Sequence, residues 1–209
     1  MKKINLLLVD DEGLLRDGLK SLLGKEPFVN EIHEAYDLET FRTKISTHQI
    51  DIVLLDIRLQ GASGMELLNT VKRDEHTKVI IVTGLEGVEL IINLLKAGVH
   101  GIVFKLDGYN EILKTIEAVM NAESYFPEKI TKIIQANAAR WDAVPSVVLT
   151  FQEKELLKGI VSGLTTKQIA LSLKMTESTT ETYRVRLLKK IGLPNTAALL
   201  AYSFRNGLL

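Results

Sequence analysis

The first 121 residues alternate short apolar runs with segments of helical length. The five runs lie at residues 4–9, 31–36, 52–55, 79–82 and 102–104, and the second of them is the weakest. Short apolar runs separated by helix-length segments are typical of β-α repeats, which build a mostly parallel sheet with helices on both faces. We therefore predict an α/β, doubly wound, five-stranded parallel sheet for this part of the chain.

Residues suited to phosphoryl chemistry follow four of these runs. Asp10 and Asp11 follow the first run, Asp56 the third, Thr83 the fourth and Lys105 the fifth. Ligands of such sheets bind beyond the carboxyl ends of the strands, so we expect these side chains to gather there. Three neighbouring carboxylates suit Mg²⁺, and a carboxylate so placed can attack a phosphoryl group whose charge a metal and a lysine offset. Each residue alone has an ordinary explanation, such as a cap or a solvated strand end, but all five at four separate strand ends predict a phosphoryl-transfer site.

The balanced charge of the whole chain hides an asymmetry. The 209 residues contain 26 Lys or Arg and 26 Asp or Glu, and no cysteine, which excludes disulfides and thiolate metal sites. From Thr150 onward nine basic residues stand against four acidic ones, a net charge of +5, and the preceding residues carry −5. A basic second part beside an acidic first part suggests two functions, the second on nucleic acid.

The second part has the pattern of four short helices. Thr150 and Glu153 fit a capping box at the start of the first helix. The other three helices are predicted at residues 166–173, 177–191 and 196–205. About three residues separate the second helix from the third, which is typical of a helix-turn-helix. We predict a smaller all-α domain over 148–209, joined to the first by a partly helical linker, 122–147, in which Pro145 blocks helix continuation.

Residues 1–121 resemble the receiver domain of bacterial response regulators, which has a flavodoxin-like fold. The motifs that carry the resemblance are Leu-Val-Asp10-Asp11-Glu12, Leu-Leu-Asp56-Ile-Arg-Leu, Val-Thr83-Gly and Phe104-Lys105. The resemblance implies that Asp56 accepts a phosphoryl group from a sensor histidine kinase. It also implies that Asp10, Asp11, Asp56 and the backbone carbonyl of Arg58 hold Mg²⁺. Such a chain is a phosphoacceptor with at most self-phosphorylation and self-dephosphorylation activity, not an enzyme.

The same resemblance makes Thr83 and Lys105 the residues that bind the phosphoryl group and couple it to rearrangement. The family usually has Tyr or Phe three residues before the lysine, where this chain has Ile102. Phe104 lies two residues further and, by strand alternation, faces the same side. We hypothesise that Phe104 substitutes for the missing aromatic residue, or that the switch works without one.

Residues 148–209 resemble the helix-turn-helix domain of the NarL/LuxR type. The motifs are Leu149-Thr150-Phe-Gln-Glu153, Gly163-Leu164-Thr-Thr-Lys167-Gln-Ile169-Ala170, Thr176-Glu177-Ser178-Thr179-Thr180 and Leu187-Leu188-Lys189-Lys190-Ile191-Gly192. Helical spacing turns one side of the third helix to the core and another to the major groove. The candidate DNA-binding residues are Lys167, Ser178, Thr179, Glu181, Thr182, Arg184, Val185, Arg186, Lys189 and Lys190. Among these, Arg184, Arg186, Lys190 and Lys167 are expected to reach phosphates. A stripe along the helix is expected to face the bases, and it consists of Ser178, Glu181, Thr182, Val185 and Lys189.

Glu181 departs from the family, which commonly has lysine at this position. A glutamate near phosphate lowers affinity, but it can accept a hydrogen bond from cytosine N4. This departure affects the expected DNA sequence preference more than DNA binding itself.

Together the two resemblances imply a cytoplasmic transcription regulator that binds double-stranded DNA. A sensor histidine kinase is its expected partner, and no membrane segment is expected. The last helix, around residues 197–204, is the expected surface of a homodimer, although its apolar residues could equally be core. One alternative is a DNA-binding dimer whose receiver no longer switches. Another is an aspartate-nucleophile phosphatase, which needs a general acid two residues past the nucleophile, where this chain has Arg58.

Overall fold

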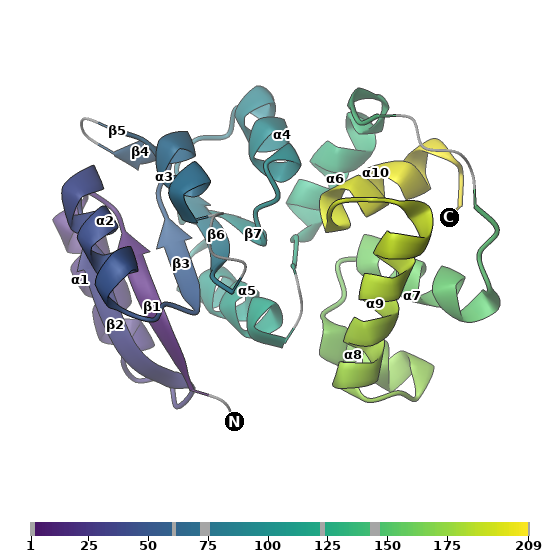
Figure 1. Ribbon diagram of the computed structural model, residues 1–209, viewed down its shortest axis with the longest axis horizontal. Helices are drawn as coiled ribbons and strands as arrows, with labels where there is room; N and C mark the ends of the chain where they lie inside the picture. The colour runs from purple at the N-terminus through teal and green to yellow at the C-terminus, as the bar shows by residue number, and fades with distance from the viewer. Residues whose placement is uncertain (1–2, 60–61, 72–75, 122–123, 143–146, 209) are drawn as a thin grey trace. The chain divides into compact units, whose positions relative to one another are not determined.

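The five apolar runs form the five strands of one parallel sheet in the computed structural model (Figure 1). The structure describes residues 3–59, 62–71, 76–121, 124–142 and 147–208. Pro145 and the predicted boundary between residues 121 and 122 lie at or among the residues outside these ranges, so the structure does not test them. The chain divides into two compact units, Met1–Glu86 with Gly101–Ile116, and Gly87–His100 with Glu117–Leu209.

The sheet has the strand order β2-β1-β3-β6-β7, with every neighbouring pair parallel. Its strands are β1 (Ile4–Val9), β2 (Val29–Ala35), β3 (Ile52–Leu55), β6 (Lys78–Thr83) and β7 (Gly101–Phe104). The predicted five-stranded parallel sheet is thereby confirmed. The order reverses direction between β1 and β3, which is the place where open α/β sheets bind their ligands.

The least accurate strand prediction concerns β2. The structure starts this strand at Val29 and ends it at Ala35, whereas the sequence pattern indicated residues 31–36. β2 is an edge strand with mostly half-buried or exposed residues, in contrast to the fully buried β3. Since one side of an edge strand meets solvent, its apolar pattern is weak and its ends are hard to predict.

A short antiparallel hairpin follows β3 and was not predicted. It pairs β4 (Arg58–Leu59) with β5 (Ala62–Ser63). Each strand has only two residues, too few for a period-two pattern to stand out in the sequence. The hairpin begins two residues after Asp56, next to the predicted site.

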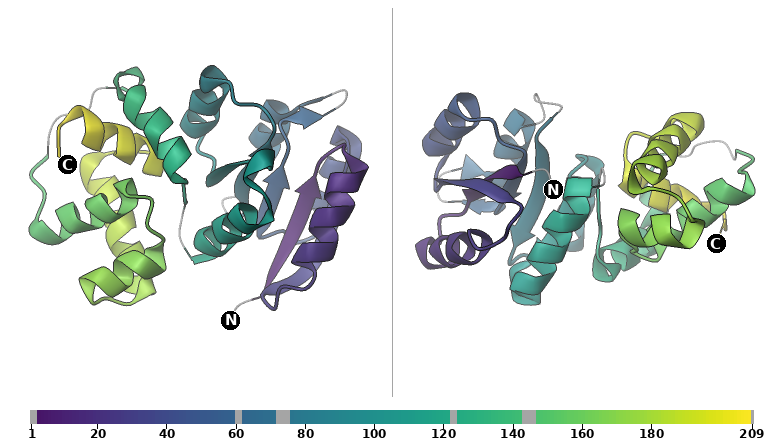
Figure 2. Two further views of the ribbon diagram at one scale, coloured as in Figure 1. Left: turned by 180° about the vertical axis from the view of Figure 1, so that it is seen from behind. Right: turned by 90° about the horizontal axis from the view of Figure 1, so that it is seen from below.

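Helices cover both faces of the sheet. They are α1 (Gly13–Leu23), α2 (Leu38–Thr47), α3 (Gly64–Val71) and α5 (Tyr109–Asn121). The view in Figure 2 places α2 and α3 on one face and α1 and α5 on the other. Because both faces are covered, the central strands are almost entirely buried, which explains their continuous apolar runs.

The second unit consists of helices. They are α4 (Val88–Lys96), α6 (Glu128–Ala136), the 3₁₀ turn η2 (Ala138–Arg140), α7 (Phe151–Val161), α8 (Thr166–Leu173), α9 (Glu177–Ile191) and α10 (Thr196–Arg205). The bounds of α8, α9 and α10 are those predicted from the sequence. Thr150 and Glu153 form the predicted capping box of α7. Gly192, at φ 79°, ends α9 in the left-handed conformation that glycine adopts without strain.

Helix α10 is covered on nearly all sides. Residues 196–203 are all buried, and the helix packs on α6, η2 and α7. In this structure the apolar residues of α10 therefore belong to the core of the unit, which is the second of the two roles expected for them. In the part of the chain that the structure describes, no helix combines the length and the apolar character needed to cross a membrane.

Candidate phosphoacceptor site and DNA-recognition helix

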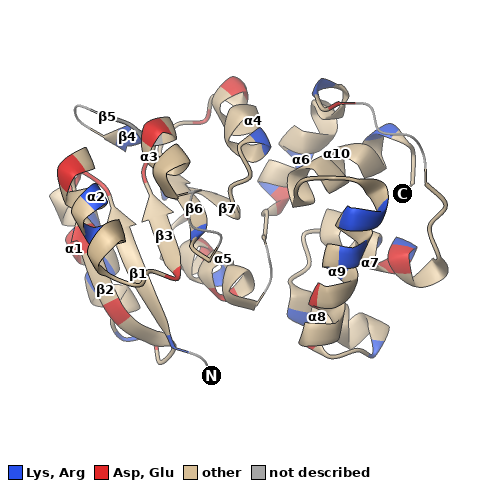
Figure 3. Cartoon of the chain, in the orientation of Figure 1, with Lys and Arg blue, Asp and Glu red and all other residues tan. Residues whose placement is uncertain are grey.

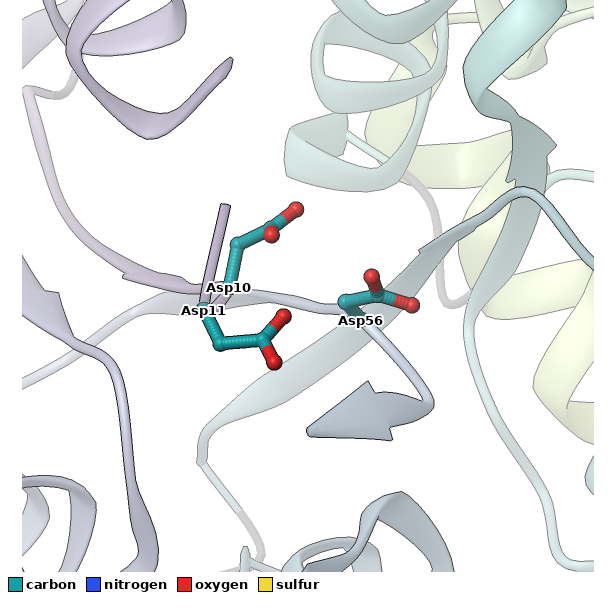
Figure 4. A group of neighbouring side chains, drawn as sticks. All are labelled: Asp10, Asp11 and Asp56. Carbon is teal, nitrogen blue, oxygen red and sulfur yellow. The ribbon is translucent and has the colours of Figure 1, made fainter. Parts of the chain in front are cut away.

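The predicted phosphoryl-chemistry residues lie together at the carboxyl edge of the sheet. Asp10 directly follows β1, Asp56 follows β3, Thr83 is the last residue of β6, and Lys105 directly follows β7. One carboxylate oxygen from each of Asp10, Asp11 and Asp56 lies within 4.8 Å of the others (Figure 4). Asp10 and Asp56 are buried, with 6% and 3% of their surface exposed. The parallel topology thus gathers residues that are up to 95 positions apart in the sequence.

Lys105 contacts three carboxylates at once. Its Nζ lies 2.6 Å from Asp56 Oδ2, 2.9 Å from Asp10 Oδ2 and 2.7 Å from Glu12 Oε1. Although burial acts to lower the pKa of Lys105, the hydrogen bonds to Asp56, Glu12 and Asp10 raise it above its ordinary value. The ammonium group therefore stays charged and offsets the repulsion between the buried carboxylates.

Burial and hydrogen bonds act in opposite directions on Asp10. Burial raises the pKa of Asp10 above its ordinary value, and the hydrogen bonds from Lys105 and from the Glu12 backbone only partly oppose this. At the exposed Glu12, the hydrogen bond from Lys105 lowers the pKa. Such a buried carboxylate is stabilised in its charged form by added positive charge, which a divalent cation would supply.

Backbone groups orient the two buried carboxylates. Asp10 Oδ1 accepts a hydrogen bond from the Glu12 N–H at 2.8 Å, and Asp56 Oδ1 accepts one from the Arg58 N–H at 3.0 Å. The Arg16 guanidinium donates to the Asp10 carbonyl at 2.7 Å. The contacts of Glu12 and Arg16 were not anticipated, since an exposed acid and a helix arginine carry no spacing signal in the sequence.

Thr83 and Phe104 are register partners on neighbouring strands. The two residues lie opposite each other in the β6–β7 pairing, and both are buried. Thr83 Oγ1 accepts a hydrogen bond from the Leu85 N–H at 3.2 Å. Ile102 is also fully buried, but it pairs with Ile81, two residues before Thr83 along β6. Of the two predicted switch residues, Phe104 is therefore the one beside the threonine.

The donor set of the acidic cluster fits Mg²⁺. Three carboxylates offer hard oxygen ligands, which this ion prefers, and they stand at the edge of the sheet where a phosphate can replace its waters. Arg58 lies beside the cluster through its backbone, with its side chain exposed. The general-acid position of a phosphatase is thus occupied by an exposed arginine.

The residues of helix α9 that were predicted to face the core are buried. They are Thr180, Leu187, Leu188 and Ile191. The opposite side forms a surface hollow, and Figure 3 shows basic residues along this helix. Its α9 lining consists of Glu177, Ser178, Glu181, Thr182, Val185, Arg186 and Lys189. This lining includes all five residues of the predicted base-facing stripe, which are Ser178, Glu181, Thr182, Val185 and Lys189.

Arg184 does not lie where it was predicted. Its surface is only 2% exposed, and its Nη1 donates a hydrogen bond to the Ser124 carbonyl at 2.9 Å. The expectation that it reaches a DNA phosphate is therefore wrong for this structure. The physical reason is its position on the core stripe, four residues after Thr180 and three before Leu187.

Two other candidates also have partners within the unit. Lys190 forms an ion pair with Glu153 of α7 at 2.7 Å. Glu181 accepts a long hydrogen bond from Thr166 Oγ1 at 3.4 Å, and its Oε2 lies 4.0 Å from Arg184 Nε. Lys167, Thr179 and Arg186 are exposed, as DNA contacts must be.

Both parts of the chain match known protein families. The response regulator receiver domain matches residues 6–117, and the luxR family of bacterial regulatory proteins matches residues 147–203. The nitrate/nitrite response regulator protein NarP of Escherichia coli is 30% identical, with 92% of this chain and 91% of NarP covered. The Fimbriae Z protein of Salmonella typhimurium is 25% identical over the full length of both chains.

Solved structures show the same fold. RcsB of Salmonella enterica serovar Typhimurium, bound to promoter P1flhDC with the phosphomimetic BeF₃⁻, superposes with a TM-score of 0.62. The alignment is 20% identical and covers 96% of this chain and 98% of RcsB. Together with the acidic cluster at the strand ends and the helix-turn-helix in the second unit, these matches identify the family of the chain. It belongs to the two-component response regulators, DNA-binding proteins that join a receiver domain to a LuxR-type helix-turn-helix domain.

Proposed function

We propose that Asp56 accepts a phosphoryl group from a sensor histidine kinase and that this modification controls DNA binding by α9. The observation that carries the proposal is the buried Asp56 carboxylate, held 2.6 Å from Lys105 and beside Asp10 and Asp11. The homologous receiver family supports the identity of the donor.

In the transfer, a carboxylate oxygen of Asp56 attacks the phosphorus of a phosphohistidine. The new O–P bond forms as the P–N bond breaks, and the departing imidazole nitrogen keeps the electron pair. Lys105 offsets the charge of the transferring oxygens. Mg²⁺ bound by Asp10, Asp11, Asp56 and the Arg58 carbonyl would supply further positive charge to the same oxygens.

Thr83 and Phe104 would convert the modification into a rearrangement. The Thr83 hydroxyl accepts from Leu85, so its own hydrogen can be donated to a phosphoryl oxygen. A movement of Thr83 toward that oxygen would change the packing of Phe104, its partner across the β6–β7 pair. Phe104→Leu keeps most of the buried volume, and we expect it to weaken the response of DNA affinity to phosphorylation while Ile102→Val leaves the response intact. A full response in Phe104→Leu would mean that the switch works without an aromatic residue.

DNA binding would use the exposed side of α9. Ser178, Thr182, Val185 and Lys189 would face the bases together with Glu181, and Arg186 and Lys167 would contact phosphates. The exposed Thr179 would contact DNA near the start of the helix. Lys190 would have to leave Glu153 to do so. Solved complexes include two RcsB dimers bound to two parallel DNAs, which supports a homodimer on paired half-sites for this chain as well.

The test is intact mass after incubation with acetyl phosphate and Mg²⁺. We expect one phosphoryl adduct on the wild type and on Asp17→Asn, an exposed control on α1, and none on Asp56→Asn. An adduct that survives in Asp56→Asn would refute Asp56 as the acceptor. Absence of the adduct with this donor and with a kinase would favour the non-switching DNA-binding alternative, and repeated turnover of phosphate esters would favour a phosphatase.

A further inference from the structure

Arg184 is a buried arginine in the middle of the recognition helix. It is the largest side chain among the fully buried residues that the structure describes. A buried guanidinium is costly unless hydrogen-bond acceptors compensate for its lost hydration. Its position on the core stripe of α9 would suit an apolar residue, so a specific partner must account for the charge.

One partner is the backbone of the segment Ser124–Phe126, which we call the strap. The Ser124 carbonyl accepts from Arg184 Nη1 at 2.9 Å in a buried setting. All three residues of the strap are buried, with 7%, 5% and 4% of their surfaces exposed. The strap precedes α6 in the predicted linker, yet it belongs to the helical unit.

The helix-turn-helix bundle provides a shaped seat for the strap. The strap residues line a small enclosed cavity together with Arg184 of α9, Ile160 of α7 and Leu200 of α10. Gly163, at φ 69°, adjoins the strap, since a Cβ there would make an ordinary van der Waals contact with the Phe126 carbonyl oxygen at 3.7 Å. The seat is therefore formed by three helices and by the loop after α7.

A second hydrogen bond also holds the strap, and it joins two backbone groups. The Tyr125 N–H donates to the His100 carbonyl at 2.8 Å. His100 directly precedes the stretch of chain that ends in Phe104 and Lys105. One three-residue segment thus has hydrogen bonds to the residue before β7 and to the recognition helix.

The docked strap is not stabilised by every group that it buries. Within the described part of the chain, the buried hydroxyls of Ser124 and Thr196 have no hydrogen-bond partner, and both line the same cavity. Burying a hydroxyl without a partner costs free energy. The hydrogen bonds with Arg184 and His100 therefore hold the docked strap against a polar penalty, which is a property expected of a contact that can be released.

We propose that Arg184 is a positioning residue that fastens the strap to α9, and that it contacts the strap and not DNA. The strap is then the segment through which a change in the receiver reaches the recognition helix. This last step rests on the function proposed above, whereas the fastening itself does not.

The experiment compares full-length Arg184→Leu with Arg186→Leu, a matched control two residues further on the exposed side of α9. Hydrogen exchange at the Tyr125 amide reports the strap. We expect exchange there to rise roughly tenfold in Arg184→Leu and to stay at the wild-type rate in Arg186→Leu. Wild-type exchange in a folded Arg184→Leu would overturn the proposal.

The salt dependence of binding to a duplex selected from a random pool distinguishes a strap contact from a phosphate contact. We expect the slope of log affinity against log salt to fall by about one in Arg186→Leu and to be unchanged in Arg184→Leu. A slope reduced by about one in Arg184→Leu would show that it contacts phosphate, and would overturn the proposal.

Two further variants keep the test decisive if Arg184→Leu does not fold. Arg184→Lys retains a donor but loses the planar guanidinium, and we expect a smaller but measurable rise in Tyr125 exchange. Phe126→Ala loosens the strap without changing α9, and we expect it to raise the same exchange at an unchanged salt slope. Wild-type exchange in both would overturn the proposal. Because the exchange readout needs no phosphorylation, its failure is distinct from a missing adduct on Asp56.

Discussion

The receiver and the recognition helix reach their functional surfaces in different ways. The receiver gathers Asp10, Asp56 and Lys105 from three strand ends, so its site depends on the topology of the sheet. The predicted DNA-recognition surface lies on one helix, α9, where buried and exposed residues alternate along the sequence. A site built from several strand ends is specified by many residues at once. A helix face is set by which side the rest of the domain covers, and one residue such as Arg184 can be assigned to the wrong side.

The largest effect is expected from Lys105→Ala, which tests how far the receiver site depends on one cation. Removing it leaves the buried Asp10 and Asp56 carboxylates facing each other, and breaking a buried ion pair from one side typically costs about 3–5 kcal/mol. We expect a loss of about that size in the free energy of unfolding in the presence of a chelator, measured by urea denaturation. Millimolar Mg²⁺ should restore most of it, and the exposed Lys25→Ala is the control. A loss below about 1 kcal/mol in chelator would show that the carboxylates do not need this cation.

A pair of glycine substitutions compares packing in the two regions. A Cβ at Gly159 would lie 2.7 Å from Ile169 Cγ1, where α7 meets α8, whereas nothing lies within 4 Å of a Cβ at Gly18 on α1. We expect Gly159→Ala to destabilise the helical unit by about 1–3 kcal/mol. Gly18→Ala should stabilise the receiver by about 0.5–1 kcal/mol, since alanine reduces the entropy of the unfolded chain. Thermal unfolding of both variants measures the difference, and equal shifts would contradict the close α7–α8 contact.

Glu181 tests whether the exposed side of α9 reads bases. If its carboxylate accepts a hydrogen bond from cytosine N4, Glu181→Ala should lose about 1–3 kcal/mol of discrimination at one base pair of each half-site. Selection of binding sequences from a random DNA pool measures this. Glu155→Ala on α7 removes the same charge away from the surface hollow and serves as the control. Retention of the wild-type preference at every position in Glu181→Ala would exclude a base contact by this residue.

The smallest effect concerns the Glu153–Lys190 pair, which holds the end of α9 to the start of α7. Burial alone would raise the pKa of Glu153, but hydrogen bonds from Lys190 and the Thr150 backbone lower it below its ordinary value. A carboxyl group whose pKa is lowered by folding stabilises the folded state at pH values above its ordinary pKa. This contribution is lost as the pH falls through the folded-state pKa. We expect Glu153→Gln to remove up to about 1 kcal/mol at pH 7, and we expect this deficit to shrink as the pH falls below the ordinary carboxyl value. The free energy of unfolding measured as the pH is lowered from 7 checks the sign, and a deficit that does not shrink would contradict it.

The sequence predicted the elements well where local signals mark their ends. In the structure Thr165, Thr176 and Asn195 cap the starts of α8, α9 and α10, and their side chains accept backbone hydrogen bonds there. The acidic cluster was also predictable, because parallel strands end at one edge of a sheet. The β4–β5 hairpin was missed, because two-residue strands have no pattern to detect.

Side-chain partners from distant backbone could not be predicted. The Ser124 carbonyl that receives Arg184 lies 60 residues away, in a segment with no periodic pattern. Arginine near a recognition surface is ordinarily interpreted as a phosphate contact, and only burial shows otherwise. The contact of Glu12 with Lys105 has the same character, since it spans 93 residues and one of its partners is exposed.

The central claim is that phosphorylation of Asp56 controls DNA binding, and the most direct measurement is DNA affinity before and after phosphorylation. The dissociation constant of the wild type for a selected duplex should fall at least about tenfold with acetyl phosphate and Mg²⁺, within the usual range of allosteric coupling. Asp56→Asn should show the same dissociation constant with and without the phosphoryl donor. An unchanged dissociation constant in wild-type protein that carries the adduct would contradict the account.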